Sequence, residues 1–281
     1  MLKISILIAH YNNAHFFKDC YQSIINQTYQ DFEVIILDDG SNKNEVVFVK
    51  ELIKNDARFI FYQNETNKGV GYTKGKLIEL ASGDICGFVD PDDTIESNAL
   101  EIMIKAHLKY PNASIINSNL NFCDQNLNVK SQSNIHQIEQ DQKDYFNFKG
   151  NISHFATLKK SFYKLTAGID SYFRIAEDQD LYLKLYEVGE SIQIEDVLYN
   201  YRLNPSSLTN ASKADISIYW HWVAAIKAAE RRGINIEDLF VENFKSRDVF
   251  DKNQKKINLL KKSKWLKLGY KLGLFKAYKY L

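Results

Sequence analysis

The stretch FEVIILDDGS, residues 32–41, places an unbroken run of apolar side chains directly before two aspartates and a glycine. Its length suits one strand that is buried on both faces, and KISILIA at residues 3–9 has the same character. The rest of the first 90 residues alternates, with helical spacing in 15–27, 45–54 and 72–80 and strand-like runs in 58–64 and 84–90. This alternation predicts an α/β fold with a mostly parallel central sheet flanked by helices.

Acidic residues follow two of the predicted strands at their carboxyl ends. Asp38 and Asp39 close the first run, and the stretch GFVDPDDTIE at residues 87–96 holds three carboxylates within four positions. In open α/β sheets, ligands bind beyond the carboxyl ends of the strands. We therefore expect both acidic clusters on one rim of the sheet, where a ligand would bind.

Crowding of Asp90, Asp92 and Asp93 raises the question of what compensates their charge. Like charges at this spacing raise one another's pKa, and a divalent cation or a helix N-terminus would relieve the repulsion. The residues alone leave two interpretations open. One is a metal site, and the other is a helix that begins near Ile95 and is capped by Asp93 or Thr94.

Composition indicates a globular protein. The chain has 281 residues, 45% of them hydrophobic, which is enough to bury a substantial core. Cys20, Cys86 and Cys123 have no metal-ligand spacing and leave an odd thiol, as expected in a reducing compartment. No stretch approaches the length of a membrane span, and the N-terminus runs into a strand pattern instead of a cleavable signal. These features predict a cytoplasmic location.

The second half of the chain is less regular. Residues 113–124 are predicted to form a strand, and 125–144 a polar loop or excursion. Residues 176–190 have helical periodicity with acidic residues in the first turn, and 215–231 are also predicted to be helical. Between these two helices, 191–204 is predicted to form a strand pair or a strand plus a turn.

Taken in order, several motifs resemble those of the inverting family 2 glycosyltransferases with the GT-A nucleotide-sugar-binding (Rossmann-like) fold. They are SILIAHYNN, QTYQDFEVIILDDGSN, NKGVGYTKGKLIELASGD, GFVDPDDTIE and AEDQDLYLKLYEVG, followed by LYNYRLNPSSLT. Together they cover roughly residues 3 to 209. A lone D-x-D motif would be weak evidence, whereas the ordered series is strong.

The resemblance implies a domain organisation. Residues 1–210 would form the GT-A catalytic domain, with a nucleotide-sugar-binding half of about 1–110 and an acceptor half of about 111–210. Residues 211–281 would form a C-terminal helical region, of which 252–281 is a basic amphipathic tail.

The resemblance also answers the question about the crowded aspartates. Asp90-Pro91-Asp92 stands at the D-x-D position, which implies Asp90 near the ribose and Asp92, with Asp90, at a Mn²⁺ or Mg²⁺ ion that bridges the diphosphate. Carboxylate oxygens suit such ions, which keep open positions for phosphate. For Asp93, a helix-capping or supporting role is as well justified as metal ligation.

Five further residues are implied in donor binding. Tyr11 would stack on uracil, Asp39 would accept a hydrogen bond from the uracil imide, and Asp38 would contact the donor or orient the loop. Lys74 stands where relatives often have an arginine, and would meet phosphate as a point charge. Arg202 would reach the diphosphate or form a structural salt bridge; for Tyr11 the alternative is an ordinary loop aromatic.

The pair Glu177-Asp178 matches the acidic pair at the start of the family's acceptor-side helix. The resemblance implies that Asp178 is the general base that removes the proton of the acceptor hydroxyl as it attacks the anomeric carbon. The alternative is helix N-terminal charge that interacts favourably with the helix dipole. We expect Asp180 on the surface of this helix.

The sequence departs from the family pattern at three places. Ala9-His10 replaces a proline and a small residue, TKG around Lys74 replaces an arginine and asparagine pair, and Asn204 replaces a histidine. These differences affect the details of donor contact more than the class of enzyme.

Residues 252–281 contain ten lysines and no acidic residue, although the whole chain has 36 basic and 35 acidic residues. Trp265, Leu268, Leu272 and Phe275 recur at helical spacing among the lysines, which is typical of a helix on an anionic membrane surface. Packing on the catalytic domain is the alternative. A nucleic-acid partner is not expected, because the remaining chain is acidic and no reading module is recognisable.

The predicted function is therefore a metal-dependent, inverting hexosyltransferase. It would move a hexose or N-acetylhexosamine from a UDP-sugar to a hydroxyl of a glycan or glycolipid acceptor at the inner face of the cell membrane. The acceptor would be a lipid-linked precursor of lipopolysaccharide, capsule or another surface glycan. One alternative is a noncatalytic nucleotide-sugar- or glycan-binding relative, against which Asp92 and Asp178 together argue. Another is a sugar nucleotidyltransferase, whose Gly-rich phosphate loop is missing from AHYNNAHF.

Overall fold

The computed structural model describes residues 2–203, 214–243, 247–275 and 278. The chain divides into two compact units, Met1–Ile234 and Asn235–Leu281, which are described separately. The end of the last motif, including Asn204, lies outside the described residues.

The first unit begins with alternating strands and helices that form four parallel strands in the order β3-β2-β1-β4. Continuous apolar runs become strands here because both faces of the sheet are covered, so that both sets of alternating side chains are buried. The elements are β1 (Ile4–His10), α1 (Ala14–Ile25), β2 (Phe32–Asp38), α2 (Lys43–Ile53), β3 (Phe59–Gln63), α3 (Val70–Leu80) and β4 (Ile85–Phe88).

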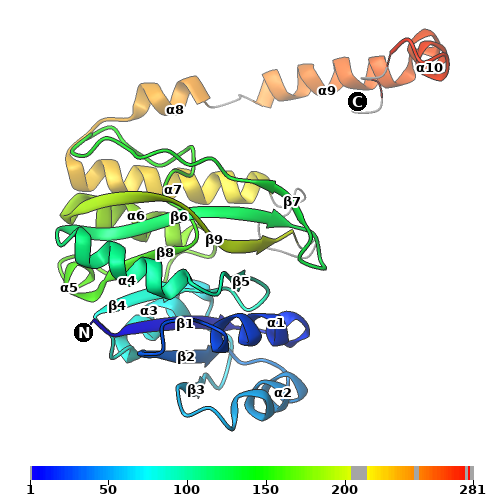
Figure 1. Ribbon diagram of the computed structural model, residues 1–281. Coiled ribbons are helices and arrows are strands. Elements are labelled where there is room, and N and C mark those ends of the chain that lie inside the picture. The colour runs from blue at the N-terminus through cyan, green and yellow to red at the C-terminus, as the bar shows by residue number, and fades with distance from the viewer. Residues whose placement is uncertain (1, 204–213, 244–246, 276–277, 279–281) are drawn as a thin grey trace. The chain divides into compact units, whose positions relative to one another are not determined.

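The second half of this unit extends the same sheet. β8 is antiparallel to β4 and to β6, whereas β6 and β9 are parallel. The elements are β5 (Thr94–Ile95), α4 (Ala99–Lys109), β6 (Ala113–Cys123), β7 (Val129–Gln132), β8 (Ala156–Lys159), α5 (Lys160–Tyr163), α6 (Glu177–Val188) and β9 (Glu190–Arg202). The described strands thus form one sheet in the order β3-β2-β1-β4-β8-β6-β9-β5, with β7 paired to β6 (Figure 1).

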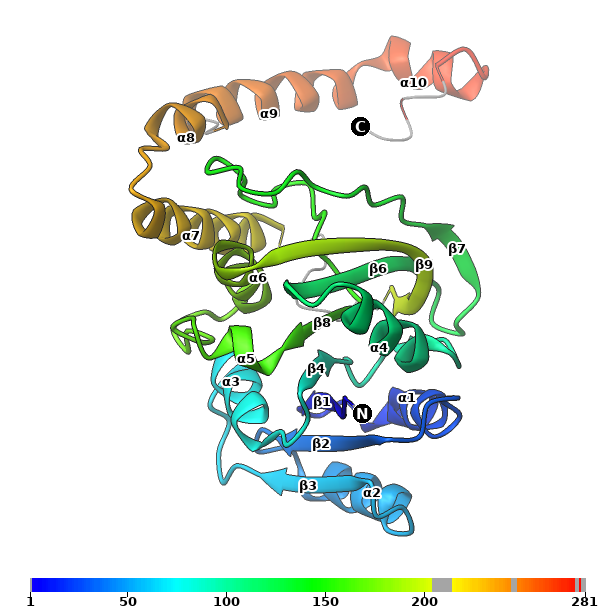
Figure 2. The same cartoon turned by 60° about the vertical axis from the view of Figure 1, so that its left-hand side comes forward.

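Two hydrophobic layers cover the sheet. Side chains of β1 alternate between them, with Ile6 in the layer formed with α1, α2 and α4, and Leu7 in the layer formed with α3 and α6. Figure 2 shows these two sets of helices on opposite sides of the strands. The structure therefore has the predicted α/β architecture, with a mostly parallel sheet flanked by helices.

Two local predictions differ from the structure. No helix begins near Ile95, because Thr94 and Ile95 form the short strand β5 paired with β9, and α4 begins only at Ala99. Both residues are β-branched, which favours a strand, and β9 supplies the hydrogen-bonding partner that the local sequence does not reveal. The second difference is in the polar excursion, which contains the short strand β7. For 191–204, the structure has the single strand β9, as in the alternative of a strand plus a turn, and not a strand pair.

Helices complete both units. α7 (Ala214–Arg232) belongs to the first unit, which continues past the domain boundary expected at residue 210. The second unit contains α8 (Glu237–Asn243), α9 (Arg247–Lys262) and α10 (Lys264–Lys271). Ser263 separates the last two helices and caps α10 by accepting a hydrogen bond from the backbone N–H of Leu266. Among the described residues, every helix is too short or too polar to cross a membrane.

Gly40, directly after Asp38-Asp39, allows a close approach of two loops at the rim of the sheet. Its φ is +78°, and a Cβ atom there would lie 2.7 Å from the backbone nitrogen of Asn67 and 2.8 Å from the carbonyl carbon of Thr66. A side chain at this position would therefore combine an unfavourable backbone conformation with a collision against main chain that cannot rotate away.

We expect Gly40→Ala to lower the free energy of unfolding by more than the roughly 1–2 kcal/mol that a left-handed conformation alone costs. Gly150→Ala is the matched control, because Gly150 has a φ of +65° and an added Cβ would contact nothing within 4 Å. Urea unfolding of both variants separates the two contributions. Equal losses would contradict the steric argument.

Candidate active site

The polar residues at the carboxyl ends of the strands line one pocket of about 940 Å³. It lies where ligands are expected in a sheet of this kind. Asp38 does not line it, whereas the other residues predicted for the site do: Tyr11, Asp39, Lys74, Asp90, Asp92, Glu177, Asp178 and Arg202.

Asp39 is held in a fixed orientation beneath one end of the pocket. Its Oδ1 accepts hydrogen bonds from Asn64 Nδ2 at 2.8 Å and from the backbone N–H of Lys68 at 2.9 Å. Its Oδ2 accepts one from the backbone N–H of Gly69 at 2.9 Å. Tyr11, by contrast, is exposed at the pocket wall. This end thus pairs a rigid, buried carboxylate with an accessible aromatic ring.

Asp38 is buried behind the pocket and holds the loop that carries Asp39. Its carboxylate lies 2.9 Å from His10 Nδ1 and accepts a hydrogen bond from the backbone N–H of Ser41 at 3.0 Å. Burial alone would raise the pKa of Asp38, but the hydrogen bonds from His10 and Ser41 outweigh it and lower the pKa. This geometry supports the loop-orienting role for Asp38, and His10 takes part in it.

The acid loop, residues 90–93, is anchored through Asp93. This buried carboxylate accepts hydrogen bonds from the Tyr199 hydroxyl at 2.8 Å and from the backbone N–H of Arg202 at 2.7 Å. Asp93 therefore joins the loop to β9 and does not cap a helix. Burial and the charges of Asp90 and Asp92 raise its pKa well above the usual range.

The carboxylates of Asp90 and Asp92 fit a hard divalent cation. They are partly exposed, line the pocket and lie close enough to Asp93 to repel its charge. Within the described part of the chain, no cluster of three or more histidine, cysteine or acidic side chains could enclose a metal. One or two carboxylates, with substrate phosphates and water, are however the usual ligands of Mg²⁺ at phosphate-binding sites.

Arg202 is buried and holds the acid loop from behind. Its Nε donates to the Asp92 carbonyl oxygen at 2.7 Å, Nη2 pairs with Asp19 at 2.9 Å, and Nη1 donates to the Gln125 carbonyl oxygen. The guanidinium also packs over the Phe16 ring, 4.4 Å from its centroid. Of the two roles considered for Arg202, the structural salt bridge is thus present, because each guanidinium nitrogen already has a protein acceptor.

Lys74 and Glu177 form a buried ion pair of 2.7 Å that links α3 to the start of α6. Burial alone would lower the pKa of Lys74, but Glu177, Asp90 and Asp178 together raise it well above its usual value. The lysine is therefore charged, and it lies between the acid loop and the acidic pair of α6.

Asp178 stands at the N-terminus of α6 and lines the pocket. Burial would raise its pKa, but Lys74, His154, the backbone N–H of Gln179 and His221 together lower it. The carboxylate is consequently ionised at neutral pH and can accept a proton.

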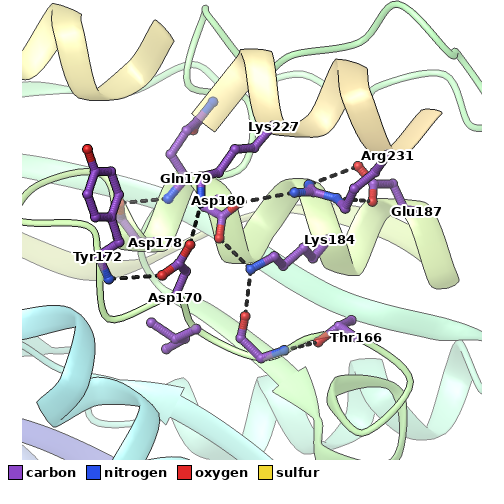
Figure 3. A network of polar contacts seen from close by, with 12 residues as sticks. Thr166, Asp170, Tyr172, Asp178, Gln179, Asp180, Lys184, Glu187, Lys227 and Arg231 are labelled. Atoms are coloured by element: carbon purple, nitrogen blue, oxygen red, sulfur yellow. Dashed lines mark hydrogen bonds and ion pairs between the residues drawn. The ribbon is translucent and has the colours of Figure 1, made fainter. Parts of the chain in front are cut away.

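An ion-pair network on the far side of α6 fixes this helix to α7 (Figure 3). Asp180 is fully buried and pairs with Lys184 at 2.5 Å and with Arg231 at 3.3 Å, while Arg231 also pairs with Glu187 at 2.7 Å. The prediction that Asp180 lies on the helix surface was wrong, because α7 covers this face of α6. In addition, Lys227 of α7 pairs with Asp170 at 2.5 Å, in the loop before α6.

Several pocket residues were not found from the sequence. His154 and His221 both lower the pKa of Asp178, and Phe148, Lys149 and Arg174 also line the pocket. None of these residues stands in a motif with characteristic spacing. The packing of α7 and of the segment before β8 brings four of them to the pocket, whereas Arg174 lies in the loop that leads into α6.

Residues 5–166, more than half of the chain, match the sequence profile of glycosyl transferase family 2. The chain belongs to this family. Relatives include a hyaluronan synthase of Pasteurella multocida, 29% identical over 265 residues, which are 92% of this chain and 27% of that protein. The putative glycosyltransferase EpsH of Bacillus subtilis is 30% identical over 216 residues, 73% of this chain and 62% of EpsH.

The family 2 chain spans only part of its larger relatives. A chondroitin synthase of Escherichia coli is 29% identical over 235 residues, which are 82% of this chain but 33% of the synthase. The chain thus matches about a quarter to a third of the two synthases.

Solved structures of glycosyltransferases share the fold. Staphylococcus aureus TarS 1-349 in complex with UDP-GlcNAc gives a TM-score of 0.62 at 16% identity, covering 92% of this chain and 80% of that chain. The mannosyltransferase PcManGT of Pyrobaculum calidifontis, in complex with GDP-Man and Mn²⁺, gives 0.61 at 15% identity, covering 80% and 64%. The fold of this chain is GT-A, as the sequence resemblance implied.

We expect Lys74→Met to lower the free energy of unfolding by about 3 kcal/mol, because it leaves the Glu177 charge buried without its partner. The double variant Lys74→Met/Glu177→Gln should recover most of the loss, since both charges are then removed together. Urea unfolding at pH 7 tests this, and a double variant as unstable as the single one would contradict it.

Proposed function

We propose that this protein transfers a hexose or N-acetylhexosamine from a UDP-sugar to a hydroxyl of a glycan acceptor, with inversion and with a divalent metal. The observation that carries this proposal is the single pocket that combines the carboxylates of the acid loop with an ionised Asp178. Family membership and the likeness to TarS solved with UDP-GlcNAc support it.

The donor would bind across the rim formed by β1, β2 and β4. Tyr11 offers an exposed ring for stacking on uracil, and the fixed carboxylate of Asp39 suits an imide N–H. Asp90 would lie near the ribose, and Asp92 with Asp90 would hold Mn²⁺ or Mg²⁺ against the diphosphate. Such an ion neutralises the charge that the departing nucleoside diphosphate gains.

Asp178 would act as the general base. It would accept the proton of the acceptor hydroxyl while that oxygen attacks the anomeric carbon from the face opposite the diphosphate. A single displacement of this kind inverts the configuration and needs no enzyme nucleophile. Glu177 and Lys74 would hold the base in place, because their ion pair fixes the first turn of α6, and Lys74 adds positive charge near the diphosphate.

The C-terminal unit would hold the enzyme on an anionic membrane surface, which fits a lipid-linked acceptor of a surface-glycan pathway. Trp265 is 81% exposed on α10, and Leu259 and Leu272 are exposed on either side of it along the chain. Lysines surround these side chains, so that apolar insertion and attraction to anionic headgroups would act together. This proposal places the protein peripherally at the inner face of the cell membrane.

Asp178→Asn should reduce transfer by at least a hundredfold, because an amide cannot accept the proton, while UDP affinity stays within about threefold. Calorimetry of UDP with Mn²⁺ and a transfer assay with a UDP-sugar panel measure the two effects separately. Turnover like that of the unaltered protein would exclude Asp178 as the base.

Asp92→Asn is the matched companion, since it removes the same charge from the acid loop of the pocket. We expect it to abolish the difference between UDP titrations carried out with Mn²⁺ and with a chelator. If the metal still enhances UDP binding in this variant, Asp92 is not a metal ligand. A protein that binds UDP normally but transfers no sugar would instead be a noncatalytic relative.

Trp265→Ala should weaken sedimentation with vesicles containing phosphatidylglycerol about tenfold, because burial of this side chain contributes roughly 1.5–3 kcal/mol. Leu165→Ala is the control, because Leu165 is similarly exposed in the first unit. Equal partitioning of the two variants would indicate that the tail packs on protein instead.

A further inference from the structure

The pocket contains a second set of side chains that the donor proposal does not use. We define the acceptor wall as Phe148, Lys149, Arg174 and His221, all of which line the pocket. They come from three places: the segment before β8, the loop before α6, and α7.

The segment that carries Phe148 and Lys149 is fixed directly beside the proposed base. Gln179, the residue after Asp178, donates from Nε2 to the Phe146 carbonyl oxygen at 2.8 Å. Asn147 is buried and donates from Nδ2 to Gln179 Oε1 at 2.8 Å, and it also closes its own turn through hydrogen bonds with Ile152. The acceptor wall is therefore built on the first turn of α6.

Phe148 presents an aromatic surface at this position. It is 47% exposed although it lines a pocket, and its ring packs against Trp222 of α7 with a centroid distance of 4.9 Å. Trp222 supports the Phe148 ring, and about half of the Phe148 side chain stays exposed. A ring held in this way can stack on a flat, partly apolar ligand. The C–H face of a pyranose is such a surface.

Lys149 and Arg174 give the acceptor wall a positive charge. Within residues 2–203 and 215–234 of the first unit, neither side chain has an acidic partner within ion-pair distance. Most pocket carboxylates come from other parts of the chain or have another partner. Those of the acid loop and Asp39 follow β4 and β2, and Glu177 is paired with Lys74. Of the two pocket-lining acids at the start of α6, Glu177 and Asp178, only Asp178 lacks a lysine or arginine ion pair among these residues.

We infer that the acceptor wall binds an anionic sugar ring, in which a pyranose stacks on Phe148 and its carboxylate or phosphate group contacts Lys149 and Arg174. The inference rests on the proposed function and names the acceptor class of that site. The two cations would offset the repulsion between an anionic acceptor and the ionised base, and so allow the reacting hydroxyl to approach Asp178.

Three ligands with the same ring test this assignment: methyl β-glucoside, methyl β-glucuronide, and methyl β-glucoside 6-phosphate. Their binding to the full chain, saturated with UDP and Mn²⁺, is measured by ligand-observed NMR titration. We expect both anionic rings to bind about fivefold or more tightly than the neutral ring. The two anions separate carboxylate from phosphate recognition, and equal affinity of all three rings, or no binding, overturns the inference.

Substitutions in the acceptor wall test which side chains produce the preference for anionic rings. Lys149→Ala/Arg174→Ala should weaken the anionic rings about fivefold and leave the neutral ring unchanged, whereas Phe148→Ala should weaken all three about equally. Lys18→Ala/Lys164→Ala is the control for the charge variant, because it also removes two positive charges, at exposed sites outside the pocket. Phe48→Ala is the control for Phe148→Ala, because it removes an exposed ring on α2. Both controls should bind every ring like the unaltered protein.

The result is separable from the proposed function because UDP binding is measured first in each variant. Failure of the unaltered protein to bind UDP would overturn the proposed function. Normal UDP binding, with equal weakening of the anionic rings by the control pair and by the pair in the acceptor wall, would overturn only the present inference. The charge-retaining variant Arg174→Lys should keep the preference for anionic rings, which shows that charge and not local folding is responsible.

Discussion

The buried ion pair of Lys74 and Glu177 is the interaction on which the site depends. The pocket holds carboxylates from two distant parts of the chain, and Lys74 is the charged group that lies between them. A buried cation that is hydrogen-bonded to Glu177 and attracted to Asp90 and Asp178 offsets part of the repulsion among these acids. The same pair joins α3 to α6. One ion pair thus both compensates charge in the pocket and connects the two halves of the fold.

The negative charge of the acid loop is compensated by other groups. Its charge is compensated from behind by the backbone N–H and the guanidinium of Arg202, at the end of β9, and by the Tyr199 hydroxyl. These contacts hold the loop's backbone and bury Asp93, while Asp90 and Asp92 line the pocket. The fold thus leaves two carboxylates at the pocket surface, with the third serving as an anchor.

The side of the pocket beyond the donor rim is built on α6 and α7. Ion pairs of Asp180 with Arg231 and of Asp170 with Lys227 connect α7 to α6, whose first turn carries Asp178, and to the loop before α6. α7 lies outside the residues that match the family profile, yet it supplies His221 to the pocket. Under the proposed function, this arrangement would let the acceptor side vary while the donor rim is kept within one fold.

The alternation of strands and helices, the mostly parallel sheet and the place of both acidic clusters could be predicted from the sequence. These features depend on local periodicity and on the rule that ligands bind at the carboxyl ends of parallel strands. Four features came only from packing: Ile95 belongs to a strand, Asp180 is buried, Arg202 supports the acid loop, and Phe148 and Arg174 line the same pocket. The physical reason is distance along the chain: Lys74 meets Glu177 across 103 positions and Arg202 meets Asp19 across 183, and periodicity carries no information about such partners.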